Sequence, residues 1–247
     1  MVDNGSSDNT VQVANQYPVR IYHCERRGIG PPRNLGLKMA NGNIVCFTDS
    51  DCVVEKEWLR KISSFFEQNS EADGVGGPVF PYPLGQSKVQ KLTGEIFVED
   101  QRYPRETKKL QFGSMDGIIF GSNSAYKKAA IVSAGGYPEP GGSNLELVWK
   151  LTSMNRNLFF NPDIKVNHIF PHDLRSIFKQ HFRWGAQLTN MKRIYHKDKG
   201  AKEVVYITYL PLRRLVHIVF HREVQRELLH LVQAASYSLG RIYGIRS

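Results

Sequence analysis

The segment Ile44-Val-Cys-Phe-Thr48 is a continuous apolar and β-branched run, and it leads directly into Asp49-Ser50-Asp51. A strand of this composition is typically buried on both faces, as in a sheet that helices cover on both sides. In open α/β sheets, ligands bind at the carboxyl ends of such strands. The run therefore predicts a central strand with a ligand site immediately after it.

Strand and helix signals alternate around this run. Further strands are predicted at Val19–His23, Val75–Val79 and Gly117–Phe120, and helices at Arg33–Ala40 and Trp58–Phe66. This alternation predicts a doubly wound α/β fold with a mostly parallel sheet. After Pro171 the apolar spacing becomes helical. We therefore expect an α/β core over residues 1–172 and a helical appendage over residues 173–247.

The net charge of +10 is concentrated in the last third of the chain. Residues 175–247 contain 14 Lys and Arg against 4 Asp and Glu, whereas residues 1–174 contain 19 of each kind. Such a basic block predicts an anionic partner, although a solvated helical face is the alternative. The amphipathic stretch Tyr206–Phe220 favours an anionic membrane surface as that partner. A nucleic-acid partner is not expected, because no DNA-binding motif or aromatic strand platform is recognisable.

The cysteines and the chain start bear on the cellular compartment. Cys24, Cys46 and Cys52 form no Cys-x-x-Cys pair and have no metal-ligand spacing, which indicates reduced thiols. No secretory signal and no membrane-spanning run is recognised. We expect a cytoplasmic protein that is peripheral on the inner face of the cell membrane.

Asp49 and Asp51 are candidate ligands of a divalent metal ion. Two carboxylates separated by one residue can bind Mg²⁺ or Mn²⁺ directly or through water, and such ions keep positions open for substrate phosphates. A metal-neutralised diphosphate is a good leaving group. The alternative for Asp51 is that it caps the following helix.

Six motifs, taken in order, resemble those of the family 2 glycosyltransferases of the GT-A fold. The resemblance runs from Val2 to about Trp184, and its last motif is similar to that of processive polysaccharide synthases. The motifs are Val2-Asp-Asn-Gly-Ser-Ser-Asp8, Arg33-Asn34-x-Gly36, Asp49-Ser50-Asp51, Gly121-Ser-Asn-Ser-Ala-Tyr126 with Gly135-Gly-Tyr-Pro-Glu139, Val166-Asn-His168, and Gln180-x-x-Arg183-Trp184.

The resemblance implies transfer of a sugar from a nucleotide-diphosphate-sugar donor to a hydroxyl of a glycan or lipid-linked acceptor, with inversion at the anomeric carbon. It implies substrate or nucleotide contacts by Asp3, Asn4, Arg33, Asn34, Asp49, Asn123, Gln180, Arg183 and Trp184. It implies a metal site formed by Asp49, Asp51 and His168.

Simpler structural roles remain open for several of these side chains. Asp3 is also a common turn former. His168 could be a core histidine with satisfied hydrogen bonds. Arg183 and Trp184 could pack as a snorkelling arginine and a buried indole.

The sequence departs from the family at the general base. Ser143 and Asn144 occupy the positions of the family's Glu-Asp pair, and an amide cannot accept the acceptor's proton. Glu146 is the substitute candidate, but Ser143-x-x-Glu146 is also a capping box. On one helix, residues 144 and 146 point about 200° apart. A catalytically inactive, nucleotide-sugar-binding relative is therefore the alternative function.

The resemblance also implies a strand and helix ahead of Val2 that form part of the nucleotide pocket. The sequence given starts after them, and only Met1 and Val2 precede the first acidic motif. We therefore expect these 247 residues by themselves to be poorly stable and nearly inactive, because apolar sheet surface would be left uncovered.

Overall fold

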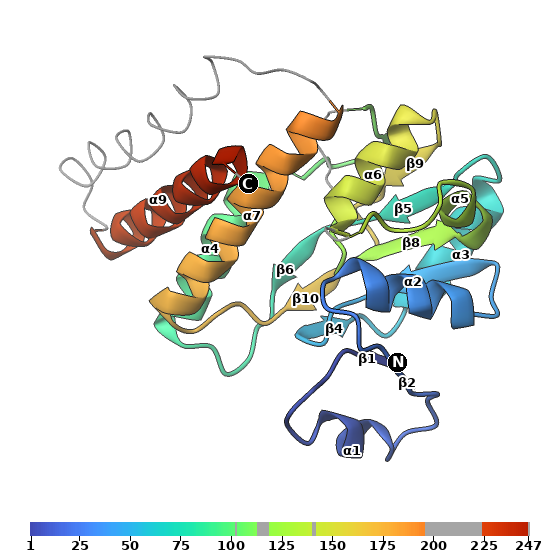
Figure 1. The fold of residues 1–247 in the computed structure, drawn as a ribbon, viewed down its shortest axis with the longest axis horizontal. Helices are drawn as coiled ribbons and strands as arrows, with labels where there is room; N and C mark the ends of the chain where they lie inside the picture. The colour runs from blue at the N-terminus through green and yellow to red at the C-terminus, as the bar shows by residue number, and fades with distance from the viewer. Residues whose placement is uncertain (102, 113–118, 140–141, 196–223, 247) are drawn as a thin grey trace. The chain divides into compact units, whose positions relative to one another are not determined.

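The computed structural model describes residues 1–101, 103–112, 119–139, 142–195 and 224–246 (Figure 1). The chain divides into two compact units, Met1–Val79 with Gln101–Asn167, and Phe80–Asp100 with His168–Ser247. This division falls near the boundary expected at residue 172. It also assigns residues 80–100 to the helical unit, which the sequence did not predict.

The described elements alternate between short strands and helices along most of the chain. The strands are β1 (Val2–Asp3), β2 (Tyr22–His23), β3 (Ile44–Phe47), β4 (Cys52–Val54), β5 (Gly74–Gly76), β6 (Val79–Pro81), β7 (Lys108–Lys109), β8 (Ser124–Lys127), β9 (Leu158–Phe160) and β10 (Val166–His168). The helices are α1 (Thr10–Ala14), α2 (Gly30–Met39), α3 (Trp58–Gln68), α4 (Lys88–Gln101), α5 (Lys128–Ser133), α6 (Asn144–Ser153), α7 (Leu174–Tyr195) and α9 (Val224–Arg246).

The main sheet has five strands in the order β3-β8-β5-β9-β7. The α/β class is confirmed, but the expected mostly parallel pairing is wrong for the described strands. Within this five-stranded sheet, β5 and β9 pair in parallel, whereas β8 runs antiparallel to both of its neighbours and β7 runs antiparallel to β9. The apolar run at β3 indicates only that both faces of the strand are buried. A mixed sheet covered by helices buries both faces as well as a parallel sheet does, so the run does not predict strand direction.

Successive side chains of β3 point to opposite faces of the main sheet. Ile44 and Cys46 pack against the core cluster that includes α3 residues Trp58 and Ile62. The ring of Phe47 points to the opposite face, where its centroid lies 6.3 Å from that of Tyr126 and 5.3 Å from that of Tyr137. Both faces of this strand are therefore covered, as its composition predicts.

Two predicted strands differ from the observed ones. The expected strand Val75–Val79 is split into β5 and β6, because Pro78 lacks an N–H and a Cβ at Gly77 would collide with the carbonyl of Ile164. Of the expected strand Gly117–Phe120, the described residues 119 and 120 are not in a strand, and the sheet is entered at β8 instead. Residues 117 and 118 lie outside the described residues.

A separate two-stranded sheet contains β1 and β2, which pair in parallel with Val2 opposite Tyr22. The next helix, α2, has Pro31 and Pro32 in its first turn, where their missing N–H groups would have no helical partner. A Cβ at Gly36 would be 3.4 Å from Val2, so α2 packs closely against β1. Strands β4, β10 and β6 form a third sheet in that order.

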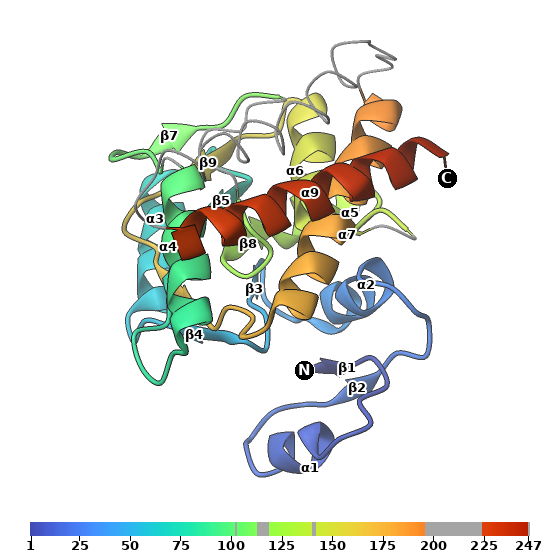
Figure 2. The same ribbon diagram turned by 90° about the vertical axis from the view of Figure 1, so that its left-hand side faces the viewer.

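The second unit contains α4, α7 and α9, which lie together in both ribbon views (Figures 1 and 2). Its apolar cluster joins one residue from each helix, namely Ile96, Ile177 and Leu229. Helices α7 and α9 are in close contact at Gly240. A Cβ at this position would collide with the carbonyl oxygen of Phe182 on α7. Arg226 on α9 also forms ion pairs with two carboxylates of α4, Glu95 and Glu99.

Among the described residues, no helix has a stretch that is both long and apolar enough to span a bilayer. The amphipathic stretch predicted at Tyr206–Phe220 lies outside the described residues.

Candidate active site

The carboxylate of Asp3 closes the turn that follows β1. It accepts hydrogen bonds from the backbone N–H groups of Gly5 and Ser6, both at 3.2 Å, and lies 3.4 Å from the Nδ1 of His23. Hydrogen bonds from Ser6 and Gly5 hold the pKa of Asp3 below its usual value. The turn role is therefore observed, and a nucleotide contact by Asp3 stays a prediction.

Asn4 anchors the same turn to the segment after β2. Its Nδ2 donates to the carbonyl oxygens of Cys24 at 2.7 Å and Arg26 at 2.9 Å. Gly5 has a φ of +83°, a backbone conformation that glycine adopts without strain. The first acidic motif is thus a rigid turn at the carboxyl end of a strand.

Arg33 on α2 lies beside the end of β3. Its guanidinium is 3.4 Å from a carboxylate oxygen of Asp49, donates to the carbonyl oxygen of Gly142 at 3.2 Å, and lies 5.3 Å from the ring centroid of Tyr137. The side chain of Arg33 is only 18% exposed, whereas that of Asp49 is 46% exposed. A fixed cation therefore stands beside an accessible carboxylate. The stacking partner Tyr137 was not predicted as a site residue.

Asp49 and Arg33 lie at the wall of a groove of about 520 Å³ in the first unit. The groove is bordered by β1, β2, α2 and β3. Its lining residues are Met1, Val2, Val19, Arg20, Tyr22, Pro32, Arg33, Gly36, Met39, Ala40, Val45, Cys46, Phe47, Thr48 and Asp49.

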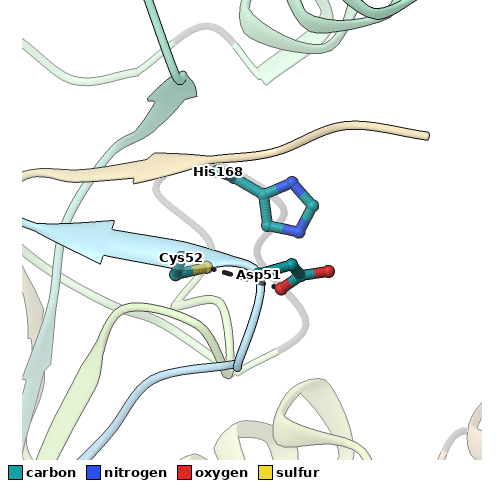
Figure 3. A group of neighbouring side chains, drawn as sticks. All are labelled: Asp51, Cys52 and His168. Atoms are coloured by element: carbon teal, nitrogen blue, oxygen red, sulfur yellow. Dashed lines mark hydrogen bonds between the residues drawn. The ribbon is translucent and has the colours of Figure 1, made fainter. Parts of the chain in front are cut away.

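Asp51, Cys52 and His168 offer ligand atoms that all lie within 4.8 Å of one another (Figure 3). Cys52 begins β4 and His168 ends β10, and these strands are neighbours in one sheet. The Sγ of Cys52 donates to a carboxylate oxygen of Asp51 at 3.8 Å. Burial, followed by the charges of Asp51 and Asp49, raises the pKa of Cys52 to about 12. Cys52 was not predicted as a ligand, because the three cysteines have no metal-ligand spacing, although its adjacency to Asp51 was a usable signal.

Asn34 and Asn123 have structural roles in the described chain. Asn34 accepts from the backbone N–H of Tyr137 at 2.7 Å and donates to the Tyr137 carbonyl at 3.0 Å, which fixes the Gly135-Gly136 turn. Asn123 is fully buried; it donates to the carbonyls of Pro78 and Ile164 and accepts from the indole N–H of Trp58. The amide of Asn123 therefore joins core segments, and its contact with a substrate stays a prediction.

Asn144, at the position of the family's base, is a buried structural residue. It lies in the first turn of α6, where its Nδ2 donates to the carbonyl of Ile119 at 2.7 Å. Its Oδ1 accepts from the hydroxyls of Tyr126 at 3.1 Å and Tyr137 at 3.2 Å. Both ends of the amide are engaged, so Asn144 holds the sheet, the Tyr137 turn and α6 together.

Glu146 lies on a different side of the same helix turn. Its backbone N–H donates to the Oγ of the N-cap residue Ser143 at 3.1 Å, so the capping half of the Ser143-x-x-Glu146 pattern is observed. Its carboxylate accepts from the backbone N–H of Gly142, and burial raises the pKa of Glu146. The carboxyl group is therefore held near Gly142, the residue whose carbonyl binds Arg33.

The Gln-x-x-Arg-Trp residues lie on α7 in the second unit. Gln180 is half-buried, and Arg183 is exposed with its Nε donating to the carbonyl of Lys179 at 3.3 Å. Trp184 is 37% exposed, and its ring centroid lies 4.9 Å from that of His181. Burial lowers the pKa of His181 to about 4, so its ring is neutral at pH 7. Contact of these residues with an acceptor stays a prediction.

The family model for glycosyl transferase family 2 matches residues 1–133, which is more than half of the chain. The glucosyl-dolichyl phosphate glucuronosyltransferase of Haloferax volcanii is 24% identical over 249 aligned residues, with 91% of this chain and 78% of that protein covered. Glycosyltransferase AglE of the same organism is 33% identical over 98 residues, which are 37% of this chain and 32% of AglE.

Solved structures show the same fold at lower identity. The mannosyltransferase PcManGT of Pyrobaculum calidifontis, solved with GDP-Man and Mn²⁺, superposes with a TM-score of 0.64 at 14% identity, covering 98% of this chain and 76% of that one. Staphylococcus aureus TarS superposes with a TM-score of 0.52 at 18% identity, covering 98% of this chain and 48% of that one. The fold is therefore GT-A-like, and the chain belongs to the family 2 glycosyltransferases.

Proposed function

We propose that this chain moves a sugar from a nucleotide-diphosphate-sugar donor to a hydroxyl on a glycan or lipid-linked acceptor, with inversion at the anomeric carbon. The observation that carries the proposal is the arrangement of Arg33, Asp49 and Glu146 around Gly142. A fixed cation and an accessible carboxylate lie at the groove, and a buried carboxyl group is held by Gly142, the same residue whose carbonyl binds that cation.

Arg33 is the residue best suited to the donor's diphosphate. Its planar fork matches phosphate oxygens, and the carbonyl of Gly142 and the ring of Tyr137 restrict its motion. Two solved structures of the same fold were determined with nucleotide ligands, PcManGT with GDP-Man and TarS with UDP. The name of the Haloferax volcanii relative includes a dolichyl phosphate, which supports a lipid-linked acceptor.

A divalent cation fits the residues after β3. Asp49 and Asp51 are accessible carboxylates, and an imidazole nitrogen of His168 lies within 4.8 Å of a ligand atom of Asp51. Carboxylate oxygen suits Mg²⁺ and Mn²⁺, and Mn²⁺ also accepts imidazole nitrogen. When bound there, the ion would neutralise charge on the departing diphosphate.

Glu146 is proposed as the general base that takes the proton of the acceptor hydroxyl. Burial raises the pKa of its carboxyl above the ordinary value, and a higher pKa makes a carboxylate a stronger base. Asn144 does not serve this role, because its amide cannot take a proton and is already bonded to Ile119, Tyr126 and Tyr137.

The second unit is proposed to bind an anionic membrane surface, where a lipid-linked acceptor would be found. Exposed apolar residues Leu174 and Phe178 on α7 stand beside the basic residues Arg175 and Lys179. Apolar groups beside Lys and Arg are the pattern of an interfacial helix.

Calorimetry with a panel of UDP- and GDP-sugars, in the presence and absence of Mn²⁺ or Mg²⁺, tests the donor site. Asp49→Asn and Asp51→Asn should each remove metal-dependent binding without unfolding the chain. Asp163→Asn, an exposed carboxylate in the same unit, is the matched control and should bind as the wild type does. Wild-type affinity in both site variants would rule out this donor site.

A further inference from the structure

The candidate metal ligand His168 is held by neighbours within the second unit. Tyr82 donates its backbone N–H to the carbonyl oxygen of His168 at 2.9 Å, which fixes the backbone at this position. The imidazole lies against the ring of Phe170, with 4.7 Å between the ring centroids and 59° between the ring planes. All three residues belong to this unit. The direction of the imidazole therefore depends on where the ring of Phe170 lies.

Phe170 is in turn held by one face of α4. Its side chain is buried, and its carbonyl oxygen accepts a hydrogen bond from the Nε2 of Gln90 at 2.9 Å. A Cβ at Gly94 would lie 3.2 Å from the Phe170 ring, so the helix approaches the ring closely at that glycine. The ring of Phe97 contacts the same ring at a centroid distance of 5.2 Å. Residues 90, 94 and 97 are spaced as one face of a helix requires.

Phe97 extends these contacts from α4 to α7. Its ring centroid lies 6.5 Å from that of Trp184, the last residue of the Gln-x-x-Arg-Trp motif. The indole of Trp184 then lies 4.9 Å from the ring centroid of His181. The two helices are also joined by the apolar contact between Ile96 and Ile177. Two predicted site residues, one on β10 and one on α7, are thus connected through α4.

The connected rings form a continuous series, which we call the aromatic row. Its members in order of contact are His168, Phe170, Phe97, Trp184 and His181. Every centroid distance in the row lies in the range of about 4.5–7 Å at which tilted aromatic pairs attract each other. Aromatic side chains are rigid, and packed interiors contain few voids, so a ring that moves displaces its neighbour.

We propose that Phe170 and Phe97 are positioning residues that couple the imidazole of His168 to the indole of Trp184. They set the placement of these two rings relative to each other. The consequence for catalysis rests on the proposed function, in which His168 helps hold a divalent cation, and on the predicted acceptor contact of Trp184. The placement of the rings does not rest on either, and it can be measured without sugar transfer.

Coupling of this kind acts in both directions. A cation that fixes the imidazole of His168 would also restrict the indole of Trp184. An acceptor against Trp184, which is 37% exposed, would favour the imidazole direction that binds the cation. A row that serves only as apolar core makes a different demand. Loss of Phe97 would then lower stability and leave the ring of His168 where it is.

Nuclear magnetic resonance on the whole chain tests the coupling, with 5-fluorotryptophan and with histidine labelled by ¹³C in the ring. Trp184→Phe and His168→Gln assign the two resonances. Phe170→Leu should shift the fluorine resonance of Trp184, and Phe97→Leu should shift the ring resonance of His168. Leu92→Ala removes an apolar contact of the same helix outside the aromatic row and should shift neither.

Calorimetry with Mn²⁺ alone measures the consequence for the cation. Phe97→Leu should weaken Mn²⁺ binding by roughly fivefold or more, which is the lower end of typical coupling between sites. Phe97→Tyr keeps the ring at this half-buried position and should restore the affinity. A wild-type chain that binds no Mn²⁺ would remove the proposed metal site, and the resonance shifts would still decide the coupling.

Trp184→Leu keeps the test decisive if the phenylalanine variants fail to fold, because position 184 is partly exposed. This change should shift the ring resonance of His168 from the other end of the aromatic row. Four results would overturn the proposal: unshifted distant resonances in folded phenylalanine variants, an unshifted His168 resonance in Trp184→Leu, equal shifts in Leu92→Ala, or unchanged Mn²⁺ affinity in Phe97→Leu when the wild type binds the ion.

Discussion

The side-chain amide of Asn144 donates a hydrogen bond to the backbone carbonyl of Ile119 at 2.7 Å. An Asn144→Asp variant would place a carboxylate oxygen against that carbonyl and lose the donor. We expect a loss of about 1–3 kcal/mol in the free energy of unfolding at pH 7, and no gain of transferase activity. Urea unfolding and a turnover assay measure the two effects.

Asn41→Asp is the matched control for this variant, because Asn41 is exposed and should tolerate the change. The penalty at position 144 should grow as pH rises through the unfolded carboxyl pKa near 4, since only the ionised group is penalised. Restored activity in Asn144→Asp would show instead that this position is a base site weakened by substitution.

Glu146→Gln separates the base from the helix cap. The Oγ of Ser143 caps the backbone N–H of residue 146, so the variant keeps the cap. Turnover should fall about 10²–10⁴-fold with donor affinity unchanged. The exposed Glu71→Gln is the control. Turnover within threefold of the wild type would remove Glu146 as the base.

The raised pKa of Glu146 makes a prediction about pH. The folded chain binds this proton more tightly than the unfolded chain, so ionisation costs stability as pH rises from the unfolded pKa to the folded one. Glu146→Gln should therefore be more stable than wild type at neutral pH and about equal to it below pH 4. Wild-type turnover should fall on acidification at a higher pH than for an ordinary glutamate. Equal stability at neutral pH would contradict this account.

Arg33→Lys should weaken donor binding although it preserves the charge. Arg33 reaches Asp49 and the carbonyl of Gly142 at once, and an ammonium group cannot reproduce that fork. We expect roughly a tenfold or greater loss of donor affinity, corresponding to about 1.4 kcal/mol or more. Calorimetry measures it, with the exposed Arg60→Lys as control. Unchanged affinity would show that Arg33 only supports the fold.

Gly240→Ala should loosen the second unit. The added methyl group would meet the backbone carbonyl of Phe182, so α7 and α9 must separate. Overpacking of this kind costs about 1–3 kcal/mol. Leu239→Ala, at a half-exposed position of the same helix, is the control. Thermal unfolding of both variants checks the prediction, and equal melting temperatures would contradict the close packing.

Membrane binding by the second unit should depend on charge. Each Lys or Arg near an anionic surface contributes about 1 kcal/mol, and salt weakens the attraction. The chain should sediment with anionic vesicles and not with neutral ones, and Lys179→Glu should reduce binding severalfold. Lys127→Glu in the first unit is the control. Equal sedimentation with both vesicle types would remove the proposal.

The sequence predicted the elements whose pattern is local. The apolar run of β3, the proline start of α2 and the helical spacing of α3 were identified, because each depends on burial or on backbone chemistry within a few residues. The strand directions were not predicted. A long connection separates β3 from β8 in the sequence, and it carries no local signal that the two strands run antiparallel. The family and its fold class followed from motif order rather than from any single motif.

Within the candidate site, the sequence identified polar side chains but not the residues with which they form hydrogen bonds. Asn123 looked like a substrate contact, yet its amide bonds to Pro78 and Ile164, residues distant in sequence. The stacking of Tyr137 on Arg33 was likewise invisible, because it joins α2 to a turn about a hundred residues later. Such tertiary contacts decide whether a polar residue faces a ligand or the core.

Gly142 links the residue proposed to bind the donor, Arg33, to the residue proposed to activate the acceptor, Glu146. Its carbonyl binds Arg33 and its N–H binds Glu146, and its φ of +68° together with backbone contact to Gly30 leaves no space for a side chain. The separation between guanidinium and carboxyl is therefore set by one peptide residue and not by two independent loops. A substitution at Gly142 would displace both groups together. One such change would therefore lower donor affinity and turnover at the same time.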